Sequence, residues 1–269
     1  MTDLSPAPHV VRRGTGVPVV FLHGNAVDHR LLLGLDDVFA AAGQWERFHL
    51  DLPGFGATPA LPEPGGLPEI ADWIDDTVTA LLGDRSFAVV GMSMGGLLAR
   101  DLAARRPEQC LGLALLAPVV DPVHANRTVP EPVVLAEDPE LIASLDPADA
   151  TAYTQLAVVQ SPENWERFRT IALPGLRAAD VDAMDRLAQR YVLDPAPDGR
   201  LAGFDRRVLI VTGLQDAVVG FEDQEALARL FPRSTVVTLD RAGHNVHLDQ
   251  PDAVRAVLAE WAEDVLGDG

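Results

Sequence analysis

One serine held between glycines, where an apolar run meets a helix-like run, constrains this chain more than any other feature. Residues 87–90 are rich in β-forming side chains, a Gly-x-Ser-x-Gly pattern occupies 91–95, and 97–104 has a helical composition. A strand that turns sharply into a helix strains the residue at the turn, and flanking side chains would collide with neighbouring elements. We therefore expect Ser93 at the edge of a sheet, with the first amides of the helix directed at whatever its hydroxyl attacks.

Strand-like and helix-like segments alternate along most of the chain. Besides 87–90 and a short edge strand at 9–13, strands are expected at 17–22, 46–51, 111–117, 208–212 and 235–239. Apolar residues at helical spacing predict helices at 29–42, 70–82, 97–104, 222–230 and 252–265. Alternating strands and helices build a mostly parallel sheet with helices on both faces. The predicted fold class is α/β, with a mostly parallel sheet of seven or eight strands flanked by helices.

The alternation stops after Pro118. Residues 138–191 contain several helical stretches and no convincing strand. Good N-cap residues predict where these helices begin, namely at Asp138, Asp146, Ser161 and Asp180. We divide the chain into a first part of the core at 1–118, a helical cap at 119–200 and a second part of the core at 201–269. Because the insertion follows the strand after the serine's, we expect it to emerge at the same sheet edge and to form a lid.

Composition and charge exclude several classes of protein. The chain is 48% hydrophobic and 23% charged, which is typical of a globular protein. Its net charge of −19 and the lack of a basic cluster argue against nucleic-acid or anionic-membrane partners. No apolar run is long enough to span a bilayer, and the first residues lack a signal-peptide pattern. The single cysteine, Cys110, rules out an internal disulfide and is typical of a cytoplasmic protein. We expect a monomer or homodimer that acts on a small molecule.

A serine hydroxyl needs a general base, and an imidazole suits that role best near neutral pH. His244 lies in a loop after the last expected strand, at the same sheet edge as Ser93, and His247 is the alternative. The base needs a carboxylate that fixes its tautomer. Asp216 follows the strand at 208–212 and is the first candidate, while Asp121 is its competitor.

An acyl-transfer reaction also needs donors for the oxyanion of its tetrahedral intermediate. The N–H of Met94, directly after the serine, is one expected donor. The loop after the strand at 17–22 supplies the second, for which we select the N–H of Asn25. The amide side chain of Asn25 could also face the substrate. His23 is expected to have a structural role within that loop.

Five motifs in this order resemble the α/β-hydrolase superfamily. They are Val-Phe-Leu-His-Gly at 20–24, Asp-Leu-Pro-Gly-Phe-Gly at 51–56, Gly-Met-Ser-Met-Gly-Gly at 91–96, Gly-Leu-Gln-Asp at 213–216 and Ala-Gly-His at 242–244. The resemblance implies an α/β-hydrolase fold with an inserted helical cap, no cofactor, no metal, and a catalytic triad of Ser93, Asp216 and His244. Within the superfamily, the chain is similar to small carboxylesterases and enol-lactone hydrolases. A serine nucleophile argues against dehalogenase or epoxide hydrolase chemistry, and Asn25-Ala26 against a peptidase.

These residues together predict a serine hydrolase that cleaves an ester or lactone of a small, largely apolar molecule. Carbon–carbon bond hydrolysis or acyl transfer by the same triad is one alternative, and a receptor-like protein with little turnover is another. Candidate substrate-binding residues, besides Asn25, are Tyr153, Trp165 and Phe168, with Leu156 and Met184 as further candidates in the cap. The alternative for each cap residue is that it packs the cap's own small core.

Overall fold

The computed structural model describes residues 5–268 and is built around one seven-stranded sheet. The strand order is β1-β3-β2-β4-β5-β6-β7; β1 is antiparallel to β3, and every other neighbouring pair is parallel. The strands are β1 (Val10–Arg13), β2 (Val17–Leu22), β3 (Trp45–Leu50), β4 (Phe87–Met92), β5 (Cys110–Leu116), β6 (Arg207–Gly213) and β7 (Ser234–Leu239). The α/β class and the mostly parallel seven-stranded sheet are therefore confirmed.

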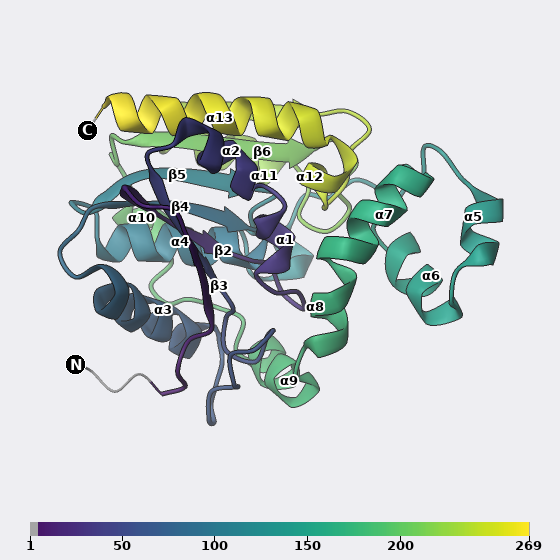
Figure 1. The fold of residues 1–269 in the computed structure, drawn as a ribbon, viewed down its shortest axis with the longest axis horizontal. Helices are drawn as coiled ribbons and strands as arrows, with labels where there is room; N and C mark the ends of the chain where they lie inside the picture. Colours follow the sequence, from purple (N-terminus) through teal and green to yellow (C-terminus); the bar gives the residue numbers. More distant parts are fainter. Residues whose placement is uncertain (1–4, 269) are drawn as a thin grey trace.

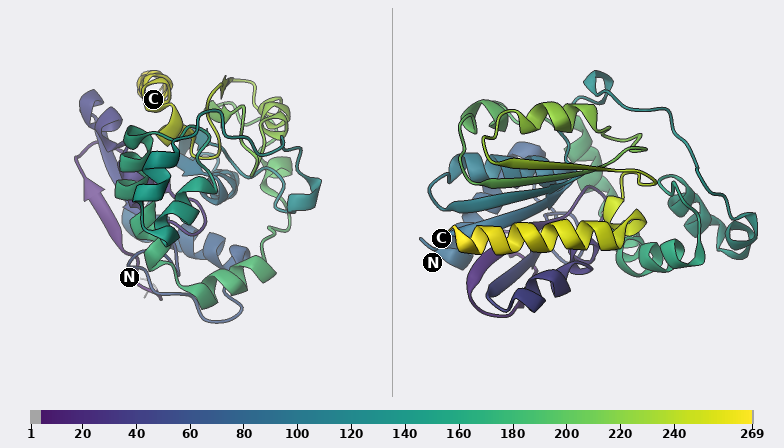
Figure 2. Two further views of the ribbon diagram at one scale, coloured as in Figure 1. Left: turned by 90° about the vertical axis from the view of Figure 1, so that its right-hand side faces the viewer. Right: turned by 90° about the horizontal axis from the view of Figure 1, so that it is seen from above.

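Helices cover both faces of the sheet, so the central strands are buried on both sides (Figures 1 and 2). One face packs against α1 (Arg30–Leu33), α2 (Asp36–Ala42) and α13 (Pro251–Gly267). The other packs against α3 (Leu67–Leu82), α4 (Met94–Arg105) and α11 (Glu222–Ala228). This sandwich fixes β4 in the middle, and its carboxyl end carries Ser93.

A group of short helices lies beyond the carboxyl ends of the strands and extends from the lower middle of Figure 1 to its right. They are α5 (Pro139–Ser144), α6 (Pro147–Thr154), α7 (Pro162–Ile171), α8 (Leu173–Ala178) and α9 (Val181–Gln189). The predicted N-caps are confirmed, because the side chains of four residues each accept a backbone N–H at the start of α5, α6, α7 and α9: Asp138, Asp146, Ser161 and Asp180.

Two further short helices lie near the two ends of the predicted cap. A short 3₁₀ helix, η1 (His124–Asn126), precedes α5. At the other end, α10 (Pro197–Arg200) packs against α4, where the buried Arg100 pairs with Asp198. The small helix α12 (Val246–Asp249) leads into α13. Among residues 5–268, no helix combines the length and the apolar character that crossing a bilayer requires.

One expected helix proves to be two. The prediction of a single helix at 29–42 is wrong, because a turn at Gly34 and Leu35 separates α1 from α2. Ile171 of the helical insertion lies where a side chain on Gly34 would be, 3.1 Å from an added Cβ. Asp36 begins α2 and pairs with Arg47 and His49 of β3, which turns the chain back onto the sheet. The split is thus caused by contacts with distant residues.

Candidate active site

The sharp turn between β4 and α4 gives Ser93 a left-handed backbone, with φ of 54° and ψ of −117°. The glycines around it are required by space. A Cβ added to Gly95 would lie 2.0 Å from the carbonyl oxygen of Leu22, and one added to Gly91 would lie 2.3 Å from that of Gly95. This geometry raises the hydroxyl above the sheet edge, as the sequence predicts.

His244 bridges Ser93 and Asp216. Its Nε2 lies 2.9 Å from the Ser93 Oγ, and its Nδ1 lies 2.9 Å from Oδ2 of Asp216. The second oxygen of Asp216, Oδ1, accepts the backbone N–H groups of Val218 and Val219. Because Asp216 can only accept, Nδ1 of His244 carries the proton and Nε2 offers its lone pair to the serine hydroxyl. Three residues from three distant loops thus form one hydrogen-bonded chain.

The two alternative residues lie elsewhere. The carboxylate of Asp121 accepts the N–H of Val123 and the side-chain amide of Asn126, so it stabilises its own turn. His247 is buried in α12, and burial lowers its pKa to about 3. Within residues 5–268, no hydrogen bond joins either one to Ser93 or to His244. The hydrogen bonds of His244 therefore favour Asp216 over Asp121 as the acid of the triad, and His244 over His247 as its base.

The expected oxyanion donors lie on both sides of the serine. Met94 is the first residue of α4, so its N–H has no carbonyl one turn earlier to bond. Gly24 approaches Ser93 closely, since a Cβ added there would lie 3.3 Å from the Ser93 Cβ. Asn25 follows directly and is exposed. Both amides remain predictions as oxyanion donors.

His23 is a structural residue of this loop. Its Nδ1 donates to the carbonyl of Gly24 at 2.7 Å, and its Nε2 accepts the N–H of Leu52 at 2.9 Å. Burial lowers the pKa of His23, so the ring stays neutral and keeps this tautomer. The ring therefore joins the loop after β2 to the loop after β3.

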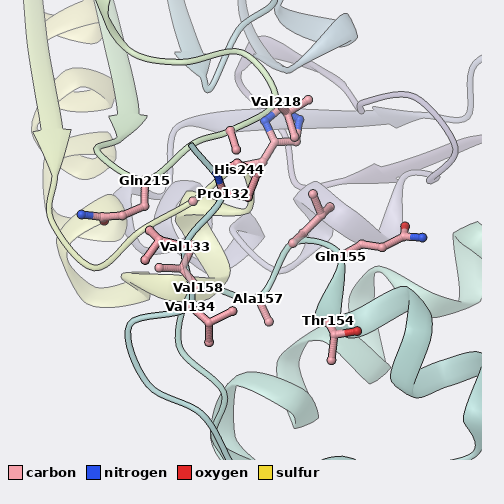
Figure 3. Close-up of a pocket in the computed structure, with 13 residues that line it drawn as sticks. Pro132, Val133, Val134, Thr154, Gln155, Ala157, Val158, Gln215, Val218 and His244 are labelled. Carbon is pink, nitrogen blue, oxygen red and sulfur yellow. The ribbon is translucent and has the colours of Figure 1, made fainter. Parts of the chain in front are cut away.

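A cavity of about 130 Å³ opens beside His244 (Figure 3). Core loops contribute its first wall, and two segments of the insertion at 132–134 and 154–158 contribute the second. The apolar lining side chains are Pro132, Val133, Val134, Leu156, Ala157, Val158, Ala217 and Val218. Apart from His244, none of the residues that line this cavity carries an ionisable side chain. The cavity thus suits a small, uncharged group.

Three of the predicted substrate-binding residues pack against one another. The ring centroids of Tyr153 and Trp165 lie 5.3 Å apart, and those of Tyr153 and Phe168 lie 5.4 Å apart. Tyr153 and Phe168 are almost fully buried. None of the three lines the cavity beside His244, so the structure favours the alternative that they form the cap's own core. Of the two further candidates, Leu156 lines the cavity and Met184 packs against the core.

The wall at 132–134 is not among the substrate-binding residues that the sequence predicts. Val133 and Val134 are 43% and 38% exposed. The signal was an apolar run between prolines with no helical or strand period. Such a run has no core of its own to fill, so its side chains are available for a ligand.

One cluster offers ligand atoms of the kind that bind metal ions. His9, His29 and Asp51 lie together beside the loop after β3. Both histidine Nδ1 atoms are 2.7 Å from Asp51 oxygens, and the same carboxylate accepts the backbone N–H groups of His29 and Ala57. Since these donors occupy the carboxylate, a cation would have to displace them. We interpret the cluster as a structural hydrogen-bond network.

Comparison with known proteins identifies the family to which this fold belongs. A family model described as the alpha/beta hydrolase fold matches residues 17–251. The chain belongs to this family. Among solved structures, the chain is similar to an alpha/beta superfamily hydrolase from Oenococcus oeni, with a TM-score of 0.87, 25% identity and 96% of each chain covered. The predicted superfamily and fold are thereby confirmed.

The chain is also similar to curated proteins of two differently named activities, an acetyltransferase component and a methyl ester esterase. One is the dihydrolipoyllysine-residue acetyltransferase component of an acetoin cleaving system from Cupriavidus necator, 29% identical over 92% of this chain. The other is the pimeloyl-[acyl-carrier protein] methyl ester esterase of Aeromonas hydrophila, 27% identical over 94% of this chain. The chain spans 64% of the length of the Cupriavidus protein and 98% of the Aeromonas protein.

Proposed function

We propose that this hydrolase cleaves a carboxylic ester or lactone of a small, largely apolar molecule through an acyl-enzyme on Ser93. The hydrogen-bonded chain Ser93–His244–Asp216 is the observation that carries the proposal. The methyl ester esterase name of several relatives supports the ester as the bond attacked. The uncharged lining of the cavity supports an apolar substrate.

The reaction proceeds in two halves. His244 takes the Ser93 proton through Nε2 as the hydroxyl attacks the carbonyl carbon, and the N–H groups of Met94 and Asn25 stabilise the oxyanion. His244 then gives that proton to the leaving alkoxide. A water molecule, deprotonated by the same ring, attacks the acyl carbon, and His244 returns the proton to the Ser93 Oγ as the acid leaves. Asp216 stays ionised throughout and stabilises the imidazolium.

The surroundings of the triad fit the same proposal. In this proposal the helices between 139 and 189 form a lid over the active site. The cavity walls at 132–134 and 154–158 select the substrate. The protein acts as a monomer or homodimer on a small molecule. A cytoplasmic location fits the single cysteine of the chain, Cys110, which is buried and can form no internal disulfide.

Acyl transfer to an acceptor other than water is the second candidate function. The acetyltransferase-component name of the Cupriavidus relative favours it over carbon–carbon bond hydrolysis. Water and an acceptor alcohol would compete for the same acyl-enzyme. The ratio of transferred to hydrolysed product therefore separates the two functions.

The test is a panel of short-chain esters and lactones, with a β-diketone and an acceptor alcohol as additional arms. Ser93→Ala should reduce ester turnover by several powers of ten while the fold is kept. Ester turnover that survives in purified Ser93→Ala would exclude the proposed mechanism. Labelling of Ser93 by a fluorophosphonate without turnover on any substrate would favour a receptor-like role.

A matched pair tests the acid of the triad. Asp216→Asn should lower kcat by about 10⁴, because an amide at this position favours the wrong histidine tautomer. Asp121→Asn should change kcat by less than about threefold, since its carboxylate bonds only within its own turn. A larger loss in Asp121→Asn would assign the role to that residue.

A further inference from the structure

The carboxylate of Asp249, at the end of α12, accepts one hydrogen bond from each side of the active site. Its Oδ2 accepts the backbone N–H of Gly243 at 2.8 Å, and its Oδ1 accepts the side-chain amide of Asn164 at 2.8 Å. Gly243 directly precedes His244, and Asn164 belongs to α7 of the helical insertion. One side chain thus connects the histidine loop to the lid.

The seam around this carboxylate is tight. Asn164 is only 4% exposed, and Arg167, one turn later in α7, donates to the carbonyl of Leu248 at 2.8 Å. A Cβ added to Gly243 would lie 2.5 Å from Cγ2 of Val158, a residue of the cavity wall. Gly243 is therefore held between the insertion on one side and Asp249 on the other. Movement of α7 would shift the residue beside the general base.

We propose that Asp249 is a positioning residue that holds the His244 loop and the lid helix α7 in one register. We name Asp249, Gly243 and Asn164 the clasp. The inference rests on the proposed function, because it assigns the clasp a role in keeping His244 aligned with Ser93. This role is separate from that of the triad, because the Asp249 carboxylate forms its hydrogen bonds with Gly243 and Asn164 and not with Ser93 or Asp216.

The clasp should respond to pH. Burial raises the pKa of Asp249 to about 6, although the hydrogen bonds from Gly243 and Asn164 oppose the shift. The other ionisable groups that act on it are Arg167, Asp216 and Tyr153. Protonation turns one oxygen into a hydroxyl, which is a much poorer acceptor than a carboxylate oxygen, so one of the two bonds is weakened. The clasp is at full strength above about pH 6 and weaker below it.

The decisive variant is Asp249→Leu, which keeps a side chain of similar size but offers no acceptor. Both the N–H of Gly243 and the side-chain amide of Asn164 then lose their partner. We expect kcat on the best ester to fall about tenfold at pH 8, with KM little changed. Asp252→Leu, three residues on and exposed, is the matched control and should retain full activity.

Exchanging the two side chains provides the rescue. In Asn164→Asp/Asp249→Asn, the new amide oxygen at 249 accepts from Gly243 while its nitrogen donates to the new carboxylate at 164. This double variant should recover kcat to within about threefold of the original. Asn164→Asp alone should be the poorest variant, because it places two carboxylates against each other. Absence of rescue would overturn the proposal.

Two measurements separate the clasp from simple stability and from the proposed function. The kcat ratio of wild type to Asp249→Leu should be constant above about pH 7 and shrink below pH 6, where protonation weakens the clasp of the wild type itself. Hydrogen exchange in the segment 242–249 of the wild type, corrected for intrinsic rates, should accelerate below the same pH. An unchanged ratio or unchanged exchange would contradict the clasp. Because exchange needs no turnover, it tests the clasp even if ester hydrolysis fails.

Discussion

Ser93 occupies a backbone conformation that glycine adopts with much less strain than any other residue. Its φ of 54° and ψ of −117° cost free energy that the surrounding contacts must supply. The N–H of Ser93 donates to the carbonyl of Leu116, and its own carbonyl accepts from Gly96 and Val119. The turn is thus fixed by neighbouring elements whichever residue lies at 93. The hydroxyl is retained at a cost in stability.

This strain predicts that Ser93→Gly is more stable than Ser93→Ala. Both variants lack the hydroxyl, but only alanine keeps a Cβ at positive φ, so the difference should be about 1 kcal/mol in favour of glycine. Chemical denaturation at pH 7.5 measures it, and both variants should lack ester turnover. Equal stability of the two variants would mean that the turn is not strained.

The candidate triad could be predicted because each member follows a strand of one parallel sheet. Parallel strands bring their carboxyl ends to one edge, so Ser93, Asp216 and His244 meet although they are far apart in sequence. No such rule places the side chains of the helical insertion. Which face of a short helix meets the cavity depends on how that helix packs on its neighbours. Tyr153 and Trp165 pack against each other and not toward the cavity.

At the scale of elements, the walls at 132–134 and 154–158 join two stretches of the insertion. The N–H of Leu135 donates to the carbonyl of Val158, and the N–H of Gln160 donates to that of Ala136. These bonds hold the stretch at 132–136 beside the stretch at 154–160, and both line the cavity next to His244 (Figure 3). This wall of the cavity is therefore made by segments that carry no triad residue, and substitutions there should change selectivity separately from chemistry.

Leu156→Ala tests this separation. Removing the side chain enlarges a cavity of about 130 Å³, so kcat/KM should shift toward longer acyl chains. We expect the ratio of hexanoyl to acetyl ester hydrolysis to rise about tenfold, within the range for one or two methylenes in an apolar pocket. Steady-state kinetics on an ester series measures this ratio.

Trp165→Ala is the matched control. Trp165 packs on Tyr153 and Phe168 and does not line the cavity, so the variant should lower thermal stability with an unchanged chain-length preference. A changed preference in Trp165→Ala and none in Leu156→Ala would place the substrate in the aromatic cluster instead.

Element boundaries show where local sequence stops being informative. Strand β2 was predicted to the residue, and the other main strands to within two residues, because buried parallel strands are nearly continuous apolar runs. The break between α1 and α2 was missed, since it depends on Ile171 and on pairing of Asp36 with β3. Such contacts join residues that no local pattern connects.

At the scale of the whole molecule, buried ionisable groups make stability depend on pH. Burial lowers the pKa values of His23, His49 and His247, so these rings stay neutral in the folded protein. In the unfolded chain they bind protons as the pH falls below about 6.5. The unfolded state then holds more protons, and the free energy of unfolding decreases on acidification. Asp249 opposes this trend, because its raised pKa makes the folded state bind a proton first.

Two carboxylates add a second stage at lower pH. Burial alone would raise the pKa of Asp36 and of Asp51, but hydrogen bonds to Asp36 from His49 and Arg47, and to Asp51 from His29 and Ala57, lower both pKa values well below the usual range. Their contribution to stability is present above the unfolded carboxyl pKa of about 4 and is lost as the pH falls below it. Acid should therefore destabilise the fold in two stages.

We expect the Tm to fall between pH 7 and pH 5, and more steeply below pH 4. A net uptake of one proton on unfolding changes stability by about 1.4 kcal/mol per pH unit, or roughly 2–4 °C in Tm for a chain of this size. His247→Leu should flatten the first stage, because it removes one buried ring that protonates only on unfolding. His124→Leu, at an exposed position, should leave the slope unchanged. A Tm that stays level or rises from pH 7 to pH 5 would show that the buried histidines do not control the acid stability.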